Sequence, residues 1–316
     1  MIQVLLLLVG FILLIKGADI FIDGASSTAQ NFKVSKMLIG LTIVAFGTSA
    51  PELAVSLRAL SSGSADLVLG NVIGSNLTNS LLILGIAVII RGLTVKQNTV
   101  KKELPLHMLI CSILVVLFLD NEINGLAPNM ISRADALVIL LLFSIFLYYI
   151  ISISRNKIDE DQEKGQYGMA KSLIFVALGL AGIIFGSDLV VNSATNIAKN
   201  LGVSERVISL TIIAFGTSLP ELVTSVISSL KKEQDILVGN IIGSNIFNIC
   251  IVLGLPVAIY GNLIPTSFQI IDFITLLFTA ILLYLIPKTN QYKFTRTDGI
   301  ALVIIYLIYY TAVFVL

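Results

Sequence analysis

The 316-residue chain contains a long internal repeat. A shift of 169 positions aligns the sequence with itself without a gap. It matches LIGLTIVAFGTSAPELAVS (38–56) with VISLTIIAFGTSLPELVTS (207–225), and LGNVIGSNLTNSLLILG (69–85) with VGNIIGSNIFNICIVLG (238–254). About half of the residues from Ile39 to Gly85 are identical to their partners. Similarity of this extent indicates that one structural unit was duplicated.

The composition places this duplicated unit in a membrane. Hydrophobic residues make up 56% of the chain and charged residues 12%, whereas a soluble domain carries about 25% charged residues. A helix needs about 20 mainly apolar residues to cross the hydrocarbon core. Ten stretches meet or approach that length, and we predict membrane spans at residues 2–22, 37–60, 66–90, 104–120, 133–153, 170–192, 206–230, 235–260, 267–287 and 297–315.

The number of spans determines how the two copies are oriented. Five spans separate each segment from its copy, and five is odd, so the copies cross the membrane in opposite directions. We therefore predict an all-α integral membrane protein with ten transmembrane helices in two inverted five-helix repeats. The repeats are residues 1–153 and 169–316, joined by a linker loop at 154–168. Inverted repeats of this kind are typical of secondary transporters, whose substrate binds near the membrane midplane.

The basic residues predict the orientation of the chain. With ten spans both termini lie on one side, and the loops on the opposite side carry most of the Lys and Arg, including Lys96, Lys101, Lys102, Lys231 and Lys232. The positive-inside rule places these basic loops, and the linker loop with them, in the cytoplasm. We therefore expect a multi-pass protein of the cell membrane with both termini extracytoplasmic. The N-terminal apolar run has no basic region before it, so we interpret it as the first span and not as a removed signal peptide.

Two glutamates, Glu52 and Glu221, occupy equivalent positions in the middle of predicted spans. A carboxylate at the bilayer centre costs several kcal/mol, by order of magnitude, unless it is paired, protonated or faces a cavity. No Lys or Arg lies at the same depth in any predicted span, so the pair indicates binding of a cation. Two protonated structural acids are the alternative, but they would not explain the duplication.

A proline precedes each glutamate. Pro51 and Pro220 lack an N–H, so the carbonyls of Gly47 and Gly216 lose their helical donor, and the helix opens there. Backbone carbonyls near Thr48 and Thr217 can then turn toward a ligand. Within one copy Thr48 and Glu52 are spaced i, i+4, which predicts that they share a helical face. A simple kink is the alternative reading of each proline.

The second motif adds a Ser and an Asn at i, i+4 in each copy: Ser75 with Asn79, and Ser244 with Asn248. Each pair offers a hydroxyl and an amide carbonyl on one face, although hydrogen bonds between helices would also use such residues. Together with the glutamates these groups form an all-oxygen ligand set, which suits Na⁺, Ca²⁺ or Mg²⁺. Two carboxylates balance one divalent charge, and a flexible oxygen cage favours Ca²⁺ over Mg²⁺.

Other classes of function fit the sequence less well. The single histidine excludes the usual zinc sites of an intramembrane metalloenzyme, and no basic patch suggests nucleic acid as a partner. A receptor that binds calcium without transporting it is a further alternative.

Several other residues are predicted to have structural, interfacial or solvated roles. They are His107, Asp19, Asp188, Cys111, Cys250 and the acidic run 157–164.

With AFGTSAPE and GNVIGSNLTN in the first copy, and AFGTSLPE and GNIIGSNIFN in the second, the chain resembles the calcium/cation antiporter superfamily, most closely the prokaryotic sodium/calcium exchangers. The resemblance implies a ten-helix fold with four central helices around the cation sites, and electrogenic exchange of Na⁺ for Ca²⁺ by alternating access. It implies no enzyme activity, no cofactor besides the transported ions and no obligate protein partner. The metal ligands that it implies are Glu52, Glu221, Asn79, Asn248, Thr48, Thr217, Ser49, Ser218, Ser75, Ser244, Ala45 and Ala214.

Two departures from the superfamily's patterns bear on ion coupling. The resemblance associates potassium dependence with an acid at the position of Asn248. The asparagine here therefore implies potassium-independent exchange. The resemblance associates proton coupling with Glu at the positions of Gly74 and Gly243. The glycines here therefore favour sodium as the coupling ion. A proton/calcium exchanger is the alternative function.

The predicted orientation can be tested by cysteine labelling. In a background without Cys111 and Cys250, we expect an impermeant thiol reagent added outside cells to label single cysteines placed at either terminus. A cysteine placed in the loop 154–168 should react only after the membrane is permeabilised. The opposite labelling pattern would reverse the orientation and leave the inverted repeat intact.

Overall fold

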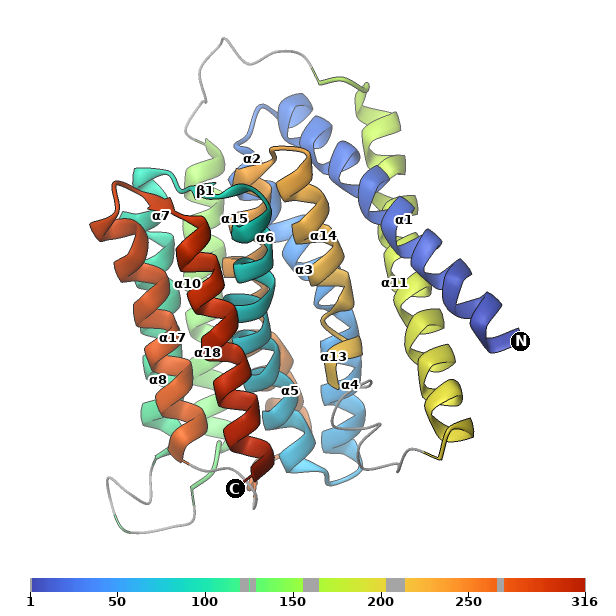
Figure 1. Cartoon of the computed structure of the whole chain (residues 1–316). Helices are drawn as coiled ribbons and strands as arrows, with labels where there is room; N and C mark the ends of the chain where they lie inside the picture. The colour runs from blue at the N-terminus through green and yellow to red at the C-terminus, as the bar shows by residue number, and fades with distance from the viewer. Residues whose placement is uncertain are drawn as a thin grey trace. The chain divides into compact units, whose positions relative to one another are not determined.

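The computed structural model describes residues 2–119, 125, 129–155, 165–202, 214–265 and 270–315, and most of these residues are helical. Figure 1 shows the helices in chain order. They are α1 (Ile2–Phe32), α2 (Lys36–Ile39), η1 (Gly40–Val44), α3 (Ala45–Thr48), α4 (Ala50–Ser61), α5 (Ala65–Leu77), η2 (Thr78–Ile83), α6 (Leu84–Arg91), α7 (Gln97–Lys101), α8 (Glu103–Phe118), α10 (Arg133–Arg155), α11 (Met169–Asn200), α13 (Ala214–Gly216), α14 (Leu219–Leu230), α15 (Gln234–Phe247), η4 (Asn248–Leu253), α16 (Gly254–Tyr260), α17 (Ile270–Thr289) and α18 (Arg296–Val315), where η denotes a π-helix.

The helices follow the predicted spans. Among the described residues, seven helices are long and apolar enough to cross a membrane, or eight if the bent pair Lys36–Thr48 and Ala50–Ser61 is one span. The predicted span 66–90 corresponds to the continuous helical segment Ala65–Arg91. The first part of the predicted span 206–230 lies outside the described residues, as do the acidic run 157–164 and most of the predicted linker loop.

Two helices, α1 and α11, continue well beyond their predicted ends at residues 22 and 192. The polar residues there end the apolar run but do not end the helix, because they find partners elsewhere in the chain. Asn31, in the last turn of α1, donates a hydrogen bond to the Tyr167 carbonyl at 2.8 Å. Polarity therefore marked the end of the apolar stretch and not the end of the helix.

The chain folds into two compact units. Unit 1 comprises Met1–Pro51 and Ser154–Asn240, and unit 2 comprises Glu52–Ile153 and Ile241–Leu316. Each unit takes segments from both halves of the sequence, so neither unit is one of the two repeats. The division into halves at 1–153 and 169–316 describes the duplication of the sequence, and it stays a prediction.

In unit 1, α1 and α11 run side by side (Figure 1). They approach so closely that a Cβ atom on Gly17 would lie 2.8 Å from the Ile183 nitrogen, and one on Gly186 would lie 2.6 Å from the Leu14 nitrogen. The same shift of 169 positions relates Gly17 to Gly186 and Leu14 to Ile183. Two copies of one helix therefore pack through equivalent contacts, and small residues make this approach possible inside a membrane.

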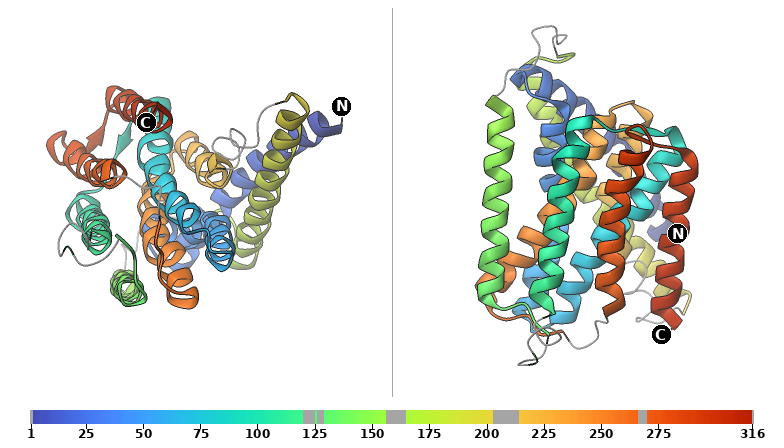
Figure 2. Two further views of the ribbon diagram at one scale, coloured as in Figure 1. Left: turned by 90° about the horizontal axis from the view of Figure 1, so that it is seen from below. Right: turned by 90° about the vertical axis from the view of Figure 1, so that its left-hand side faces the viewer.

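In unit 2, the helices α8, α10, α17 and α18 stand roughly parallel (Figure 2, right). The Phe118 and Phe273 rings stack with their centroids 4.3 Å apart, which joins α8 to α17. A short antiparallel sheet pairs β1 (Leu93–Thr94) with β2 (Lys293–Phe294). These contacts connect the helices of the first half to those of the second within one unit.

Two buried acids in unit 2 also occupy equivalent positions. Glu103 is the first residue of α8, and Asp272 lies in the first turn of α17. The hydroxyl of Tyr149 on α10 donates a hydrogen bond to Glu103, and that of Tyr309 on α18 donates one to Asp272 at 2.7 Å. These acids were not predicted from the sequence, although the shift of 169 positions pairs them.

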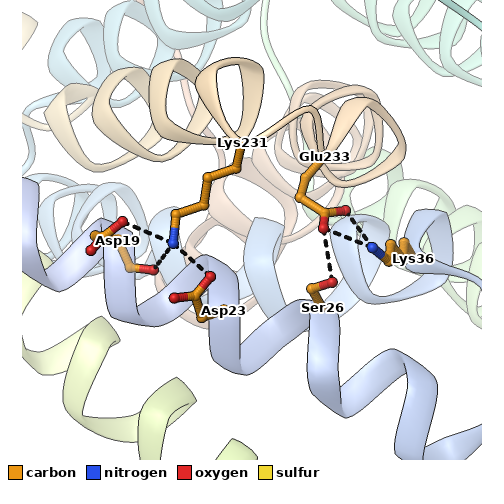
Figure 3. A network of polar contacts seen from close by, with 6 residues as sticks. All are labelled: Asp19, Asp23, Ser26, Lys36, Lys231 and Glu233. Atoms are coloured by element: carbon orange, nitrogen blue, oxygen red, sulfur yellow. Dashed lines mark hydrogen bonds and ion pairs between the residues drawn. The ribbon is translucent and has the colours of Figure 1, made fainter. Parts of the chain in front are cut away.

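A network of ion pairs fastens α1 to the segment between α14 and α15 (Figure 3). The Lys231 Nζ lies 2.8 Å from Asp19 Oδ1 and 2.6 Å from Asp23 Oδ1, and it also donates to the Asp19 carbonyl oxygen at 2.8 Å. Glu233 accepts hydrogen bonds from Lys36 at 2.7 Å and from Ser26 at 3.0 Å. Asp19, predicted to be interfacial or packed, is therefore an ion-pair partner.

The sequence does not repeat this network with the two copies exchanged. The counterparts of Lys231 and Glu233 in the first copy are Ser62 and Ser64, which carry no charge. The counterpart of Asp19 is Asp188, whose side chain is exposed. The two copies are thus held differently at this position.

The Lys231 ion pairs predict how stability depends on pH. Burial alone would lower the pKa of Lys231, but the hydrogen bonds and charges of Asp19 and Asp23 outweigh burial and raise it. The stabilisation is complete below the ordinary lysine pKa of about 10.4 and is lost as the pH rises through the raised folded value. Lys231→Met should lower stability by about 1 kcal/mol and weaken this alkaline loss.

Thermal unfolding in detergent at neutral and alkaline pH would measure both effects. Lys232→Met is the matched control, because Lys232 is the exposed neighbour and carries the same charge. Equal losses of stability in the two variants would show that the ion pairs contribute nothing.

Candidate cation-binding site

The first repeated motif breaks its helix at a serine in both copies. Helix α3 ends at Thr48 and α4 begins at Ala50, with a bend of 45° between the segments. Ser49 has φ −86° and ψ 7°, and its counterpart Ser218 has φ −87° and ψ 4°. The predicted opening of the helix before each proline is therefore confirmed. Thr48 and Glu52, predicted to share one helical face, lie on opposite sides of this break.

In the second copy the break leaves a backbone carbonyl that finds a new partner. Pro220 cannot donate to the Gly216 carbonyl, and the Ser187 hydroxyl donates to that oxygen instead, at 3.1 Å. In the first copy the Ala45 carbonyl keeps its ordinary helical donor, the Ser49 N–H, at 3.1 Å. The sequence held no signal for the Ser187 contact, because the counterpart of Ser187 in the first copy is an alanine.

Glu221 is the acid of the second motif, in the first turn of α14, and its side chain is buried. The Ser49 hydroxyl, from the first motif, donates to Glu221 Oε1 at 2.9 Å. The other oxygen, Oε2, has no hydrogen-bond partner among the described residues. A buried carboxylate oxygen without a partner is costly, so this oxygen is suited to bind a cation. Unit 1 thus brings two predicted ligands from different repeats together.

Two repeated asparagines that the sequence analysis overlooked support the motif helices. Asn240 Nδ2 donates to Ser225 Oγ at 3.2 Å, and Asn71 Nδ2 donates to Ser56 Oγ at 2.9 Å. These are equivalent contacts, one in each copy. A signal was present, because both residues of each pair are identical in the two copies.

Each of these asparagines also holds a predicted ligand residue. Thr48 Oγ1 donates to Asn240 Oδ1 at 3.2 Å. Asn71 Nδ2 donates to the backbone carbonyl of Glu52 at 2.9 Å, and Glu52 itself is buried. Both asparagines therefore hold residues beside the first helix break, at Ser49.

The second motif contains a π-helix in each copy, which the sequence analysis did not predict. Asn79 lies in η2, and Asn248 begins η4. π-Helical turns inside α-helices are frequent at functional sites. Both asparagines are fully buried. Asn79 Oδ1 and both amide atoms of Asn248 have no hydrogen-bond partner among the described residues.

The two units contain different parts of the predicted ligand set. Ser75 and Ser244 are buried and Thr217 is partly exposed, while the side chain of Ala214 is outside the described part of the chain. Unit 1 contains Ala45, Thr48, Ser49, Ala214, Thr217, Ser218 and Glu221, and unit 2 contains Glu52, Ser75, Asn79, Ser244 and Asn248.

Each unit contains buried oxygens without a hydrogen-bond partner among the described residues. They are Glu221 Oε2 in unit 1, and Asn79 Oδ1 and Asn248 Oδ1 in unit 2. Buried polar atoms in proteins are normally satisfied by some partner. Oxygen ligands of this kind suit hard cations such as Na⁺ and Ca²⁺.

Comparisons with known proteins agree with this chemistry. The chain is 36% identical over 312 residues to the inner membrane protein YrbG of Escherichia coli, covering 94% of this chain and 92% of that one. It is 30% identical to the sodium/calcium exchanger MaX1 of Methanosarcina acetivorans, covering 98% of each chain. A solved structure of the sodium-calcium exchanger NCX_Mj, soaked with Na⁺, is similar with a TM-score of 0.86 and 33% identity, covering 97% of each chain.

The likeness to NCX_Mj confirms the predicted fold class, an all-α membrane protein with ten transmembrane helices in two inverted repeats. The model of the family described as "Sodium/calcium exchanger protein" matches residues 2–152 and 171–315. That family consists of transporters and not of enzymes. The chain is therefore a member of the sodium/calcium exchanger family. It is a multi-pass membrane protein and a cation/calcium antiporter.

Proposed function

We propose that this chain exchanges Na⁺ for Ca²⁺ by alternating access, electrogenically and without a requirement for K⁺. The observation that carries the proposal is the buried Glu221 carboxylate, which has a serine hydroxyl on one oxygen and no hydrogen-bond partner among the described residues on the other. A cation supplies the missing interaction. A transported cation, unlike a permanent structural ion, requires ligands that can bind and release it.

The ligand set supports calcium as one substrate. Glu52 and Glu221 together carry two negative charges, which balance one Ca²⁺. Asn79 and Asn248 add amide oxygens without adding charge. Ca²⁺ accepts such mixed, flexible oxygen cages, whereas Mg²⁺ demands a near-octahedral one.

Two observations support sodium as the counter-ion. MaX1 and NCX_Mj, which the chain resembles over nearly its whole length, are both named as sodium/calcium exchangers. The proton-coupled pattern has Glu at positions where this chain has Gly74 and Gly243. Sodium coupling therefore fits better than proton coupling.

Flux in reconstituted liposomes tests the proposed exchange. An outward Na⁺ gradient should drive uptake of labelled Ca²⁺, and a pH gradient without Na⁺ should not. Uptake driven by the pH gradient alone would replace sodium with protons as the coupling ion. The proposed orientation, with both termini extracytoplasmic, is tested separately by the cysteine labelling described above.

The two glutamates should be essential for exchange. Glu52→Gln and Glu221→Gln keep the size of the side chain but remove its charge, so we expect each to abolish sodium-driven calcium flux while the protein remains folded. Asp188→Asn is the matched control, because Asp188 is an exposed acid of unit 1. Normal flux in either glutamine variant, with folding verified by size-exclusion chromatography, would contradict the proposed role.

The neutral Asn248 should make exchange independent of potassium. We expect equal calcium flux with K⁺ and with choline as the background cation. Asn248→Asp adds a third negative charge and a titratable group to the site. It should therefore tighten cation binding, slow release and make flux sensitive to K⁺ or to pH. A natural protein that requires K⁺ together with Ca²⁺ would show that the neutral asparagine does not determine this selectivity.

A further inference from the structure

The chain's single histidine, His107, is buried in α8 and contacts a polar network in unit 2. Its Nε2 lies 3.3 Å from Asn245 Nδ2 and 3.5 Å from Cys111 Sγ. Its Nδ1 has no hydrogen-bond partner among the described residues. An amide NH₂ group can only donate, so Nε2 accepts the hydrogen bond and the ring is neutral.

Asn245 uses its whole amide in this network. Its Nδ2 donates to Ser80 Oγ at 2.6 Å as well as to His107, and its Oδ1 accepts from Asn79 Nδ2 at 3.2 Å. Its NH₂ group therefore faces Ser80 and His107, and its oxygen faces Asn79. These contacts hold the Asn245 amide from both ends.

The orientation of Asn245 in turn determines that of Asn79. The Asn79 NH₂ group is held by Asn245 Oδ1, so its Oδ1 is the atom left without a hydrogen-bond partner among the described residues. That oxygen is fully buried with its residue. The network thus presents the oxygen of Asn79, and not its NH₂ group, as the atom available to a cation.

The sequence does not repeat this network with the two copies exchanged. The counterpart of Asn245 is Asn76, whose Nδ2 donates to the Val72 carbonyl of its own helix at 2.8 Å. The counterparts of Ser80 and His107 are Ile249 and Leu276, neither of which can accept a hydrogen bond through its side chain. The sequence departs from its own repeat at the two positions that hold Asn245.

We propose that His107 is a positioning residue for cation exchange, which acts through Asn245 to hold the Asn79 oxygen in place for the transported cation. The inference rests on the proposed function, because it takes Asn79 as a cation ligand. His107 itself contacts no ion. Its contribution is to hold the Asn245 amide, whose oxygen accepts a hydrogen bond from the Asn79 NH₂ group.

Two substitutions of His107 separate positioning from packing. His107→Leu places in the first copy the residue that the second copy carries, and it removes the acceptor. His107→Gln retains a side-chain oxygen that can accept from Asn245. We expect His107→Leu to raise the Ca²⁺ concentration for half-maximal flux about tenfold, the effect of losing roughly one hydrogen bond. We expect His107→Gln to restore it to within about threefold.

The second measurement is Ca²⁺ binding in detergent, which is determined from the dependence of the melting temperature on the Ca²⁺ concentration. His107→Leu should weaken binding in the wild-type background but add nothing to Asn79→Ala, because both changes remove one interaction. Ser80→Ala removes the other acceptor of Asn245 and should weaken binding in the same direction. It also keeps the proposal testable if His107→Leu does not fold.

The wild-type protein distinguishes the two proposals. If it shows no sodium-driven calcium flux, the proposed function fails whatever the His107 variants do. If the wild type exchanges the ions and folded His107→Leu has an unchanged Ca²⁺ requirement, the positioning role alone is overturned. A His107→Gln variant as defective as His107→Leu, or additive losses with Asn79→Ala, would also overturn it.

Discussion

A carboxylate buried in a membrane protein must be balanced by positive charge, protonated or placed beside water, and the rest of this structure depends on that requirement. Glu221 lies directly after a helix break, where Ser49 from the other repeat stabilises one of its oxygens. The break places backbone and hydroxyl groups beside the acid where a continuous helix would have none to offer. In the proposed exchange, a loosely held cation completes this set of interactions and can still leave.

Such a site needs rigid support, because flexible polar groups would satisfy one another instead of an ion. The contacts of Asn71 with Ser56 and of Asn240 with Ser225 supply that support in both copies. Close packing of α1 on α11 at Gly17 adds a tight helix contact elsewhere in unit 1. Hydrogen bonds and small residues together replace the hydrophobic effect, which does not hold helices together in lipid.

The two copies of the repeat are equivalent in their motifs but not in their supporting contacts. Lys231 and Glu233 form ion pairs where the first copy has serines, and His107 holds an asparagine where the second copy has Leu276. An exchanger with two identical halves would hold its substrate identically from either side of the membrane. These departures give each half its own set of interactions, so the two halves are not energetically identical.

The sequence by itself determined the class of fold, most of the spans and the position of the helix breaks. Apolar length, an odd number of spans between copies and the prolines at 51 and 220 are local or periodic properties, and they can be read without knowing which residues meet. Helix ends were harder: the polar Asp19 and Asp23 interrupt the apolar run of α1, yet the helix continues because Lys231 satisfies them.

Only the tertiary structure decided which polar groups are satisfied by protein and which buried ones have no hydrogen-bond partner among the described residues. The Ser187 hydroxyl donates to the Gly216 carbonyl, and the Ser49 hydroxyl donates to one oxygen of Glu221. The Asn245 side-chain oxygen accepts from the NH₂ group of Asn79. The partners in the last two pairs lie more than a hundred residues apart, and neither hydropathy nor spacing pairs such residues. The physical reason is that a hydrogen bond depends on distance and direction in space, whereas a sequence pattern records only separation along the chain.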